Sequence, residues 1–437
     1  MRLCNRLLYL CANHCLRGTV SGGGTMTGTD SSREHDRRLI RALTCLMFFT
    51  FAMTTDAVGS VIPQIIDEFA LSLKAAGSFQ YATMAGIAAG AFFLGFIADR
   101  LGRKRTIVLG LALYGASSLL FAFGSAFATF VVLLAAAGLG ISIFKIGALA
   151  LIGDISASTT SHTRFMNTVE GFFAVGAIVG PAIVATLIAT GFSWKWLYII
   201  AATICAVLVV IAALVRYPRS APSSRPATFR QMLEVLNDPL ALGFSSLIAL
   251  YVAVEVAIYV WMPTYLRDYH GASAWLPTYA LTIFFVLRAV GRFLGAWFLG
   301  RLAWTLALAL MGCAIFTCFL GSLLWNGAAG TWLLPLSGLF MSVMYPTLNS
   351  KGISCFRKSQ HGAAAGVILF FTAVAAALGP LAMAAVSDAY DSSRAGFVLA
   401  SVFAFLLFAG LVCNWLLDPA QRRLTSSDLE DYGKSTA

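Results

Sequence analysis

Residues 95–105 read GFIADRLGRKR, a short basic loop between two long apolar runs. Its glycines suit a tight turn and a close approach of helices, and the carboxylate of Asp99 can accept hydrogen bonds from backbone N–H groups at the start of a facing helix. The loop therefore predicts a junction at which two helices turn at a membrane surface and contact the end of another helix. A merely basic turn on the inner membrane surface is the alternative interpretation.

The composition of the whole chain is typical of a membrane protein. Of its 437 residues, 59% are hydrophobic and only 11% are charged. Apolar runs of about 20 residues recur almost throughout, and a run of that length crosses the hydrocarbon core as a helix. The net charge of +11 comes from basic residues in the short segments between these runs, so we expect no nucleic-acid partner.

The apolar runs predict an all-α membrane protein with twelve transmembrane helices in two pseudo-symmetric six-helix halves. The predicted spans are residues 40–62, 77–98, 106–125, 128–151, 164–189, 194–215, 240–266, 275–298, 304–324, 331–350, 362–387 and 395–417. The predicted divisions are a cytoplasmic tail (1–38), the first half (39–215), a cytoplasmic linker rich in Pro, Ser and Arg (216–238), the second half (239–417) and a second cytoplasmic tail (418–437).

Arginine and lysine are unevenly distributed between alternate loops. If the amino terminus is cytoplasmic, the outer loops hold little more than Lys74, Lys195, Arg267 and Arg394. The asymmetry predicts that both termini lie inside, in the inner membrane of a bacterium. Because the codons of three glycines shortly before Met26 could form a ribosome-binding site, we also expect translation to start at Met26.

The two halves share features at an offset of about 200 residues, as expected of a transporter built from two parallel repeats. The matching positions are Gly180-Pro181 with Gly379-Pro380, Gly138-Leu139 with Gly338-Leu339, His162 with His361, and Asp56 with Glu255. In such transporters the substrate site lies near the membrane midplane between the repeats.

Residues 95–105 resemble the signature loop of the major facilitator superfamily, Gly-x-x-x-Asp-Arg-x-Gly-Arg-Arg/Lys. The resemblance implies a loop that joins the two halves on the cytoplasmic side and acts as a gate. The implied gate residues are Gly95, Asp99, Arg100, Gly102, Arg103 and Lys104. The counterpart in the second half places Leu299 opposite Asp99, so we expect any gate contact there to be weaker.

Ionisable side chains within the predicted spans are few, and each is a candidate functional group because a charge at membrane depth is costly. Asp56 is the first candidate for proton coupling, since no basic residue on the first two spans shares its depth. Glu255 is the second, with Arg288 of the next span as an ion-pair partner. Lys145 and Glu170 lie at similar depth on neighbouring spans and are predicted to pair, for which a purely structural role is an equal alternative.

Polar and aromatic residues add further candidates for the cavity. Asn167, Tyr345 and Asn349 offer amides and an aromatic face that suit a polyhydroxylated ligand. Tyr265 lies near the outer end of its span, where a role in the interfacial belt of aromatic residues is the favoured interpretation.

Two further stretches, residues 251–266 and 344–347, are similar to the fucose permease and related proton-linked sugar permeases. The resemblance implies an acidic residue in the first helix and another in the fourth. In this sequence the corresponding positions are Gly59 and Ile143, which carry no carboxylate. A sugar acid that pairs with Lys145 or Arg288 is therefore an alternative to fucose.

We expect a secondary transporter that takes up a sugar, a sugar-like solute or an organic acid together with protons by alternating access. A drug- or metabolite-proton antiporter is the alternative, because residues 176–181 resemble part of the antiporter motif. A non-transporting membrane sensor is a further one. We expect no enzyme activity, cofactor or metal, because the sequence shows no nucleophile elbow, phosphate loop or metal-ligand cluster. The expected partners are a small-molecule solute, H⁺ and the lipid bilayer, with the chain acting as a monomer.

Overall fold

The computed structural model of the chain describes residues 28–55, 57, 61, 73–124, 126–218, 228–267, 276–299, 301–325 and 328–432. These residues form helices and their connections, with no strand among them. Two of the predictions, the start of translation at Met26 and the coupling role of Asp56, fall on residues outside these ranges.

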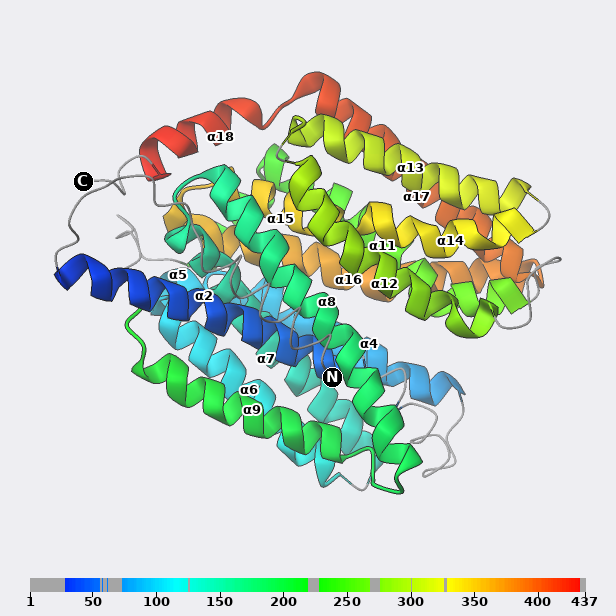
Figure 1. Cartoon of the computed structure of the whole chain (residues 1–437), viewed down its shortest axis with the longest axis horizontal. Helices are drawn as coiled ribbons and strands as arrows, with labels where there is room; N and C mark the ends of the chain where they lie inside the picture. The colour runs from blue at the N-terminus through cyan, green and yellow to red at the C-terminus, as the bar shows by residue number, and fades with distance from the viewer. Residues whose placement is uncertain are drawn as a thin grey trace.

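In the described residues each half of the fold contains six long helical segments. The two halves lie side by side in Figure 1. The first half consists of α2 (Gly28–Thr55), α4 (Leu73–Leu94), α6 (Arg103–Ala122), α7 (Phe127–Ile155), α8 (Thr159–Ala189) and α9 (Trp196–Leu214). The second half consists of α11 (Pro239–Arg267), α12 (Leu276–Phe298), α13 (Trp304–Leu324), α14 (Ala328–Met341) with α15 (Met344–Ser354), α16 (His361–Ala389) and α17 (Ser393–Leu417).

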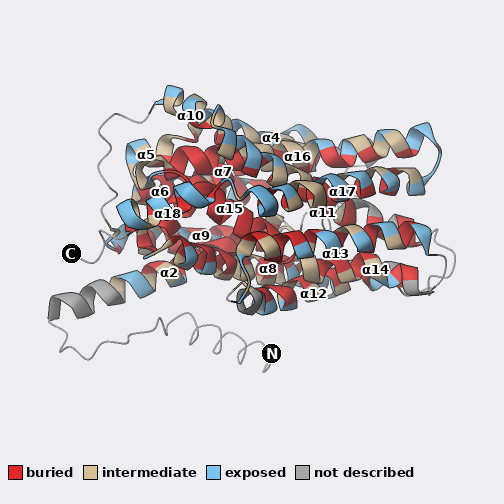
Figure 2. Cartoon of the chain, turned by 90° about the horizontal axis from the view of Figure 1, so that it is seen from above, coloured by how far each residue is buried: buried red, intermediate tan, exposed pale blue. Residues whose placement is uncertain are grey.

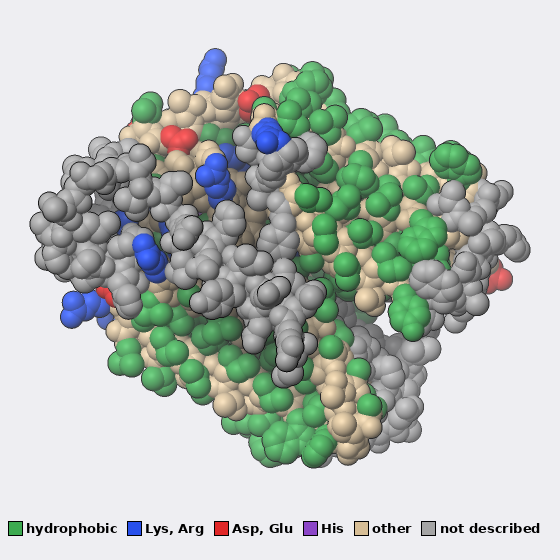
Figure 3. All heavy atoms as spheres, in the orientation of Figure 1, with side chains coloured by type: hydrophobic (Ala, Val, Ile, Leu, Met, Phe, Trp, Pro, Cys, Tyr) green, Lys and Arg blue, Asp and Glu red, His purple; other side chains and the backbone are tan. Residues whose placement is uncertain are grey.

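The flanks of the molecule are suited to lipid. Nine helices of the described part are long and apolar enough to cross a membrane. Large side chains such as Phe123, Leu214 and Leu324 are exposed there rather than buried. Figure 3 shows hydrophobic side chains spread over these flanks, with Lys and Arg gathered toward one end of the visible face. The chain is therefore a multi-pass integral membrane protein.

Small residues allow the helices of each half to pack closely at equivalent places. A Cβ atom on Gly138 of α7 would collide with the carbonyl oxygen of Thr83 on α4. A Cβ atom on Gly338 of α14 would collide in the same way with the carbonyl oxygen of Phe284 on α12. Close approach through glycine is the usual way in which membrane helices gain packing contacts. The matching contacts support the internal repeat expected from the sequence.

Three short helices lie at one end of the molecule, as Figure 2 shows: α5 (Ile97–Leu101), α10 (Phe229–Leu236) and α18 (Gln421–Ser427). A π-helical turn, η2 (Asp428–Tyr432), continues α18. This end carries Arg100, Lys104, Arg105, Lys358 and Arg423 and is called the basic end below.

Helices α10 and α18 lie in the segments predicted to be a cytoplasmic linker and a cytoplasmic tail, for which no helix was predicted. In α10, Met232 and Val235 are buried, and in α18 Leu424 is buried. Short amphipathic helices of this kind escape a search for long apolar runs, because only one side of each helix is apolar. The tenth predicted span also differs, since it is divided between α14 and α15.

Candidate functional site

The loop at residues 95–105 joins the two halves at the basic end through Asp99. Its carboxylate accepts hydrogen bonds from the backbone N–H groups of Gly362, at 3.1 Å, and Ala363, at 2.9 Å. These amides belong to the first turn of α16, where the helix dipole favours a negative charge. A Cβ on residue 362 would lie 2.8 Å from the carboxylate of Asp99, so this position needs glycine. The predicted contact between Asp99 and the start of a facing helix is confirmed.

Arg103 connects this carboxylate to two further groups. It donates to Asp99 at 2.5 Å, to Asp154 of α7 at 2.9 Å and to the carbonyl oxygen of Lys358 at 2.6 Å. The side chains of Arg103 and Asp99 are 2% and 1% exposed, so water screens this ion pair little. Burial raises the pKa of the Asp99 carboxyl above its ordinary value, while the charge of Arg103 acts in the opposite direction.

The other predicted gate residues shape the loop or hold its surroundings. Gly102 has a φ of +83°, which favours glycine, and Gly95 lies against Gly366 of α16, where a Cβ would not fit. Lys104 donates to the carbonyl oxygens of Ala213, at 2.6 Å, and Val215, at 3.0 Å, at the end of α9. Arg100 is exposed.

A second set of contacts between the halves lies beside the loop. His162 of α8 hydrogen-bonds the hydroxyl of Ser354 at 2.6 Å, and Thr163 hydrogen-bonds Ser350 at 3.0 Å. The rings of His162 and His361 are stacked with their centroids 5.9 Å apart. These two histidines, which match in the internal repeat, therefore meet at the interface between the halves.

The carboxy-terminal segment adds a third set of contacts at the basic end. Asp428 of η2 accepts hydrogen bonds from the backbone N–H of Thr159, at 2.7 Å, and from its hydroxyl, at 2.9 Å, at the start of α8. Arg423 of α18 pairs with Asp238 at 2.7 Å. Since Thr159 belongs to the first half and Asp238 precedes α11, the segment bridges the halves. Together the three sets of contacts, which we call the clasp, close this end of the molecule.

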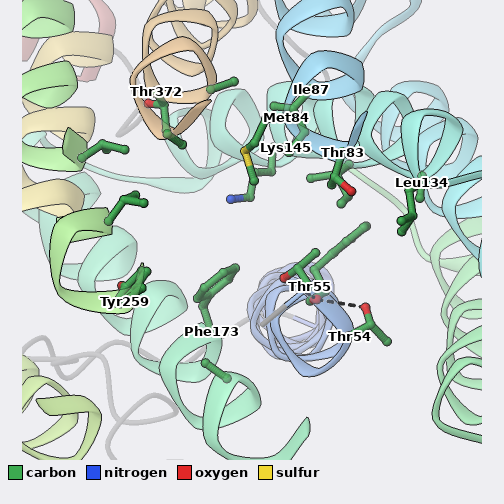
Figure 4. A pocket seen from close by; sticks show the side chains of 18 of the residues that line it. Thr54, Thr55, Thr83, Met84, Ile87, Leu134, Lys145, Phe173, Tyr259 and Thr372 are labelled. Carbon is green, nitrogen blue, oxygen red and sulfur yellow. Dashed lines mark hydrogen bonds between the residues drawn. The ribbon is translucent and has the colours of Figure 1, made fainter. Parts of the chain in front are cut away.

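A cavity of about 520 Å³ lies between the halves, beyond the clasp. Aromatic rings line much of its wall, among them Phe51, Tyr81, Phe173, Tyr259 and Tyr345. Hydroxyl groups are contributed by Thr54, Thr55, Thr83 and Thr372, several of which are visible in Figure 4. The charged residues in the lining are Lys145, Glu170, Glu255, Arg288 and Arg292. Such a mostly apolar site with a few polar groups is typical of a small-molecule pocket.

The predicted pair of Glu255 and Arg288 is present on the side of the second half. The carboxylate of Glu255 contacts the guanidinium of Arg288 and accepts a hydrogen bond from the hydroxyl of Tyr251 at 2.7 Å. Arg288 also donates to the hydroxyl of Tyr259. The carboxylate is therefore held by a cation from α12 and a hydroxyl from its own helix.

The predicted pair of Lys145 and Glu170 is wrong. Glu170 of α8 instead lies 3.7 Å from Arg292 of α12, so the ion pair crosses from the first half to the second. Lys145 faces the rings of Phe173, at 5.0 Å, and Phe48, at 5.9 Å. A comparison of depth on neighbouring spans could not identify Arg292 as the partner of Glu170, because the two residues lie on helices of different halves.

The remaining predicted residues divide between the cavity and the packing around it. Tyr345 lines the cavity. The amide of Asn167 donates to the carbonyl oxygen of Thr163 at 2.9 Å, and Asn349 is buried; neither is part of the described lining. Tyr265 is buried and donates to the carbonyl oxygen of Ser322 at 3.0 Å, so its place is in the protein rather than in an interfacial belt. The threonine hydroxyls of the cavity carried no signal in the sequence.

Comparison with known proteins gives relatives over most of the chain. The glucose/galactose transporter of Brucella abortus biovar 1 (strain 9-941) is 24% identical over 406 residues, which cover 88% of this chain and 96% of that protein. The L-fucose-proton symporter of Escherichia coli (strain K12) is 24% identical over 348 residues, which cover 71% and 79%. Both relatives are transporters, and this chain is likewise a transporter and not an enzyme.

A solved structure and a family model agree with the fold described above. The crystal structure of FucP in the outward conformation matches with a TM-score of 0.74 at 22% identity, and the match covers 86% of this chain and 98% of that one. The family model of the Major Facilitator Superfamily matches residues 44–380, which include the signature-like loop and the residues that line the cavity. With two packed six-helix halves around a shared cavity, this chain belongs to the Major Facilitator Superfamily.

Proposed function

We propose that this secondary transporter carries a sugar-like or organic acid solute into the cell together with protons, by alternating access to the central cavity. The observation that carries the proposal is the pairing of two buried carboxylates, Glu170 and Glu255, with two arginines of the single helix α12. A proton that binds to either carboxylate removes the negative charge that attracts α12. Relatives named as a glucose/galactose transporter and an L-fucose-proton symporter support a sugar-like solute and a proton.

Glu170 is the carboxylate best placed to link protonation to movement of the halves. It belongs to α8 of the first half, and its partner Arg292 belongs to α12 of the second. Loss of the charge on Glu170 therefore weakens a contact between the halves, whereas loss of the charge on Glu255 acts within the second half. A ligand or proton shifts a conformational equilibrium only by its different affinity for the two states, and a pair that forms in one arrangement of the halves supplies such a difference.

Other candidates remain for the same coupling role. Asp56 lies outside the described residues and is still proposed from its depth in the first span. Glu255 is proposed as a second coupling residue, for whose carboxylate Arg288 and the solute compete. The proposed gate is the clasp, with Asp99 and Arg103 at its centre.

The distribution of basic residues supports the orientation of the chain. We propose that the basic end faces the cytoplasm of a bacterial cell, so that both tails, the linker and the clasp lie inside. With the clasp formed, the arrangement described above then has its cytoplasmic side closed. We also propose that the chain acts as a monomer, because each chain contains both halves and the whole cavity.

Reconstitution into liposomes tests the proposal. The lumen contains a pH-sensitive dye, and neutral sugars, sugar acids and other organic acids are added to the outside one at a time. We expect one of these solutes to acidify the lumen, and we expect Glu170→Gln to lose this acidification while it retains solute exchange. Glu234→Gln, on the exposed surface of α10, is the matched control. Acidification at the wild-type rate in Glu170→Gln would contradict the role of Glu170.

The same liposomes distinguish the alternatives. Acidification that depends on Asp56 but not on Glu170 would move the coupling site to the first span. Proton movement caused only by amphiphilic cations would replace the proposed symport with antiport.

A further inference from the structure

Lys145 is the cation of the central cavity whose charge is least compensated by the described residues. It belongs to α7 and is partly exposed, and its ammonium group points into the cavity in Figure 4. Its interactions within the described ranges are with aromatic rings, those of Phe173 and Phe48, and no described carboxylate lies within 4.0 Å of it. An aromatic ring attracts a cation but carries no net charge.

The charged side chains in the described lining of the cavity include one more cation than anions. The described lining holds three cations, Lys145, Arg288 and Arg292, and two carboxylates. Glu255 is paired with Arg288, and Glu170 with Arg292, so neither is paired with Lys145. An ammonium group at membrane depth without a counter-ion is costly, and a carboxylate brought by a ligand lowers that cost through a charge-assisted hydrogen bond.

The wall near Lys145 indicates what the rest of the ligand is like. The ammonium faces Phe173 on one side of the cavity, and the rings of Tyr259 and Phe285, stacked with centroids 5.3 Å apart, lie on the wall of the second half. Flat apolar walls of this kind suit an aromatic or otherwise apolar body. Aliphatic side chains such as Ile87, Ile141 and Val252 extend the apolar part of the lining, beside hydroxyl groups such as that of Thr55.

We infer that the transported solute is an organic monocarboxylate with a largely apolar body, and that Lys145 binds its carboxylate. This inference rests on the proposed function, because it assigns the solute of the same cavity. The cation that no described carboxylate pairs with accounts for a single carboxylate, and the aromatic wall accounts for the apolar body. Lys145 is therefore the residue that decides between an anionic and a neutral solute.

Two matched pairs of probes test the inference by isothermal titration calorimetry on the purified full-length chain. Phenylacetate and phenylacetamide share a ring and differ in charge, and gluconate and glucose share a hydrophilic body and differ in the same way. We expect phenylacetate to bind at least about tenfold more tightly than the other three probes. Lys145→Met should lower the affinity for phenylacetate by about tenfold or more and leave the affinity for phenylacetamide unchanged. Lys145→Arg should retain most of the affinity for phenylacetate.

Controls separate lost binding from lost folding. Each variant is compared with the wild type by size-exclusion chromatography and thermal unfolding, and Arg230→Gln removes an exposed cation outside the cavity. Phenylacetate that binds equally well to Lys145→Met overturns the inference. So does tighter binding of glucose than of phenylacetate, or the absence of saturable phenylacetate binding at millimolar concentration.

The outcome is distinguishable from a failure of the proposed function, because binding in detergent needs no proton gradient. Binding of phenylacetate that depends on Lys145, without acidification of liposomes, would support the solute class and contradict proton coupling. Acidification driven by a neutral sugar in Lys145→Met would support proton coupling and overturn the solute class.

Discussion

The clasp and the central cavity both place buried charges between the two halves, but they satisfy those charges to different degrees. In the clasp, the carboxylate of Asp99 accepts hydrogen bonds from two backbone N–H groups and from a guanidinium. Arg103 donates hydrogen bonds to three oxygen atoms at distances of up to 2.9 Å. In the cavity, Arg292 reaches Glu170 only at 3.7 Å, and both of its terminal nitrogens lack a hydrogen-bond partner among the described residues. Among the described residues, the interactions of Lys145 are with the aromatic rings of Phe48 and Phe173.

This difference indicates how the molecule separates closure from transport. The hydrogen bonds of Asp99 and Arg103 favour one arrangement of the chain, because each of these buried charges is costly to leave unpaired. A network with unused donors keeps capacity for a solute and for a change of protonation. The clasp is therefore suited to hold one conformation, and the cavity to respond to what enters it.

The largest expected effect comes from breaking the clasp at its centre. Asp99→Asn removes the charge that holds Arg103 and the first turn of α16, and breaking a buried pair costs about 3–5 kcal/mol. We expect the basic end to open and turnover to slow without a change in which solute binds. Spin labels at positions 105 and 357, in a background without native cysteines, should report longer distances in Asp99→Asn.

Arg100→Gln is the matched control for this experiment, because Arg100 is exposed in the same loop. An altered preference among solutes in Asp99→Asn, with unchanged label distances, would contradict a gate role for the clasp.

A smaller effect is expected from the pair within the second half. Glu255→Gln leaves Arg288 buried without its carboxylate, although the hydroxyl of Tyr259 still accepts a hydrogen bond from it. We expect a loss of stability of about 2–3 kcal/mol and a loss of solute transport. Thermal unfolding of Glu255→Gln, Arg288→Gln and the double variant measures the coupling of the pair. Additive effects of the two single substitutions would show that the pair contributes no interaction energy.

The carboxy-terminal contact should be weaker again. Asp428 accepts hydrogen bonds from the first residue of α8, and a charged cap of this kind contributes about 1 kcal/mol. Asp428→Ala should raise the population with the longer label distance by a few-fold at most. A shift as large as that of Asp99→Asn would place the centre of the clasp in this segment instead.

The smallest effect is expected at the exposed pair of Arg230 and Glu234 on α10. Its side chains are 88% and 59% exposed, and such pairs contribute at most about 0.5 kcal/mol. Transport and label distances in Arg230→Gln should match those of the wild type. A clear defect would show that α10 takes part in gating.

The fold and the part of the clasp around Asp99 could largely be predicted from the sequence, because both leave local signals. Long apolar runs mark the spans, and residues 95–105 hold most of one side of the clasp in one short loop. The pair of Glu255 and Arg288 could also be predicted, since its members lie at equal depth on consecutive helices.

Contacts between the halves carried a weaker signal. Arg292 lies four residues after Arg288, on the same side of α12. Its pairing with Glu170 depends on how the two halves are oriented relative to each other, which the sequence pattern of a single helix does not indicate. The bridge through Asp428 depends on a short segment after the last span, where packing rather than propensity decides the structure.

The most direct test of the account compares the ratio of protons to solute moved in liposomes by the wild type, Asp99→Asn and Glu170→Gln. The account predicts that Asp99→Asn transports more slowly at the wild-type ratio, because the clasp sets the closed conformation and not the coupling. It predicts that Glu170→Gln moves solute with few or no protons, because the carboxylate between the halves is lost. The account would be contradicted if Glu170→Gln moved as many protons per solute as the wild type. It would also be contradicted if Asp99→Asn moved fewer protons per solute than the wild type.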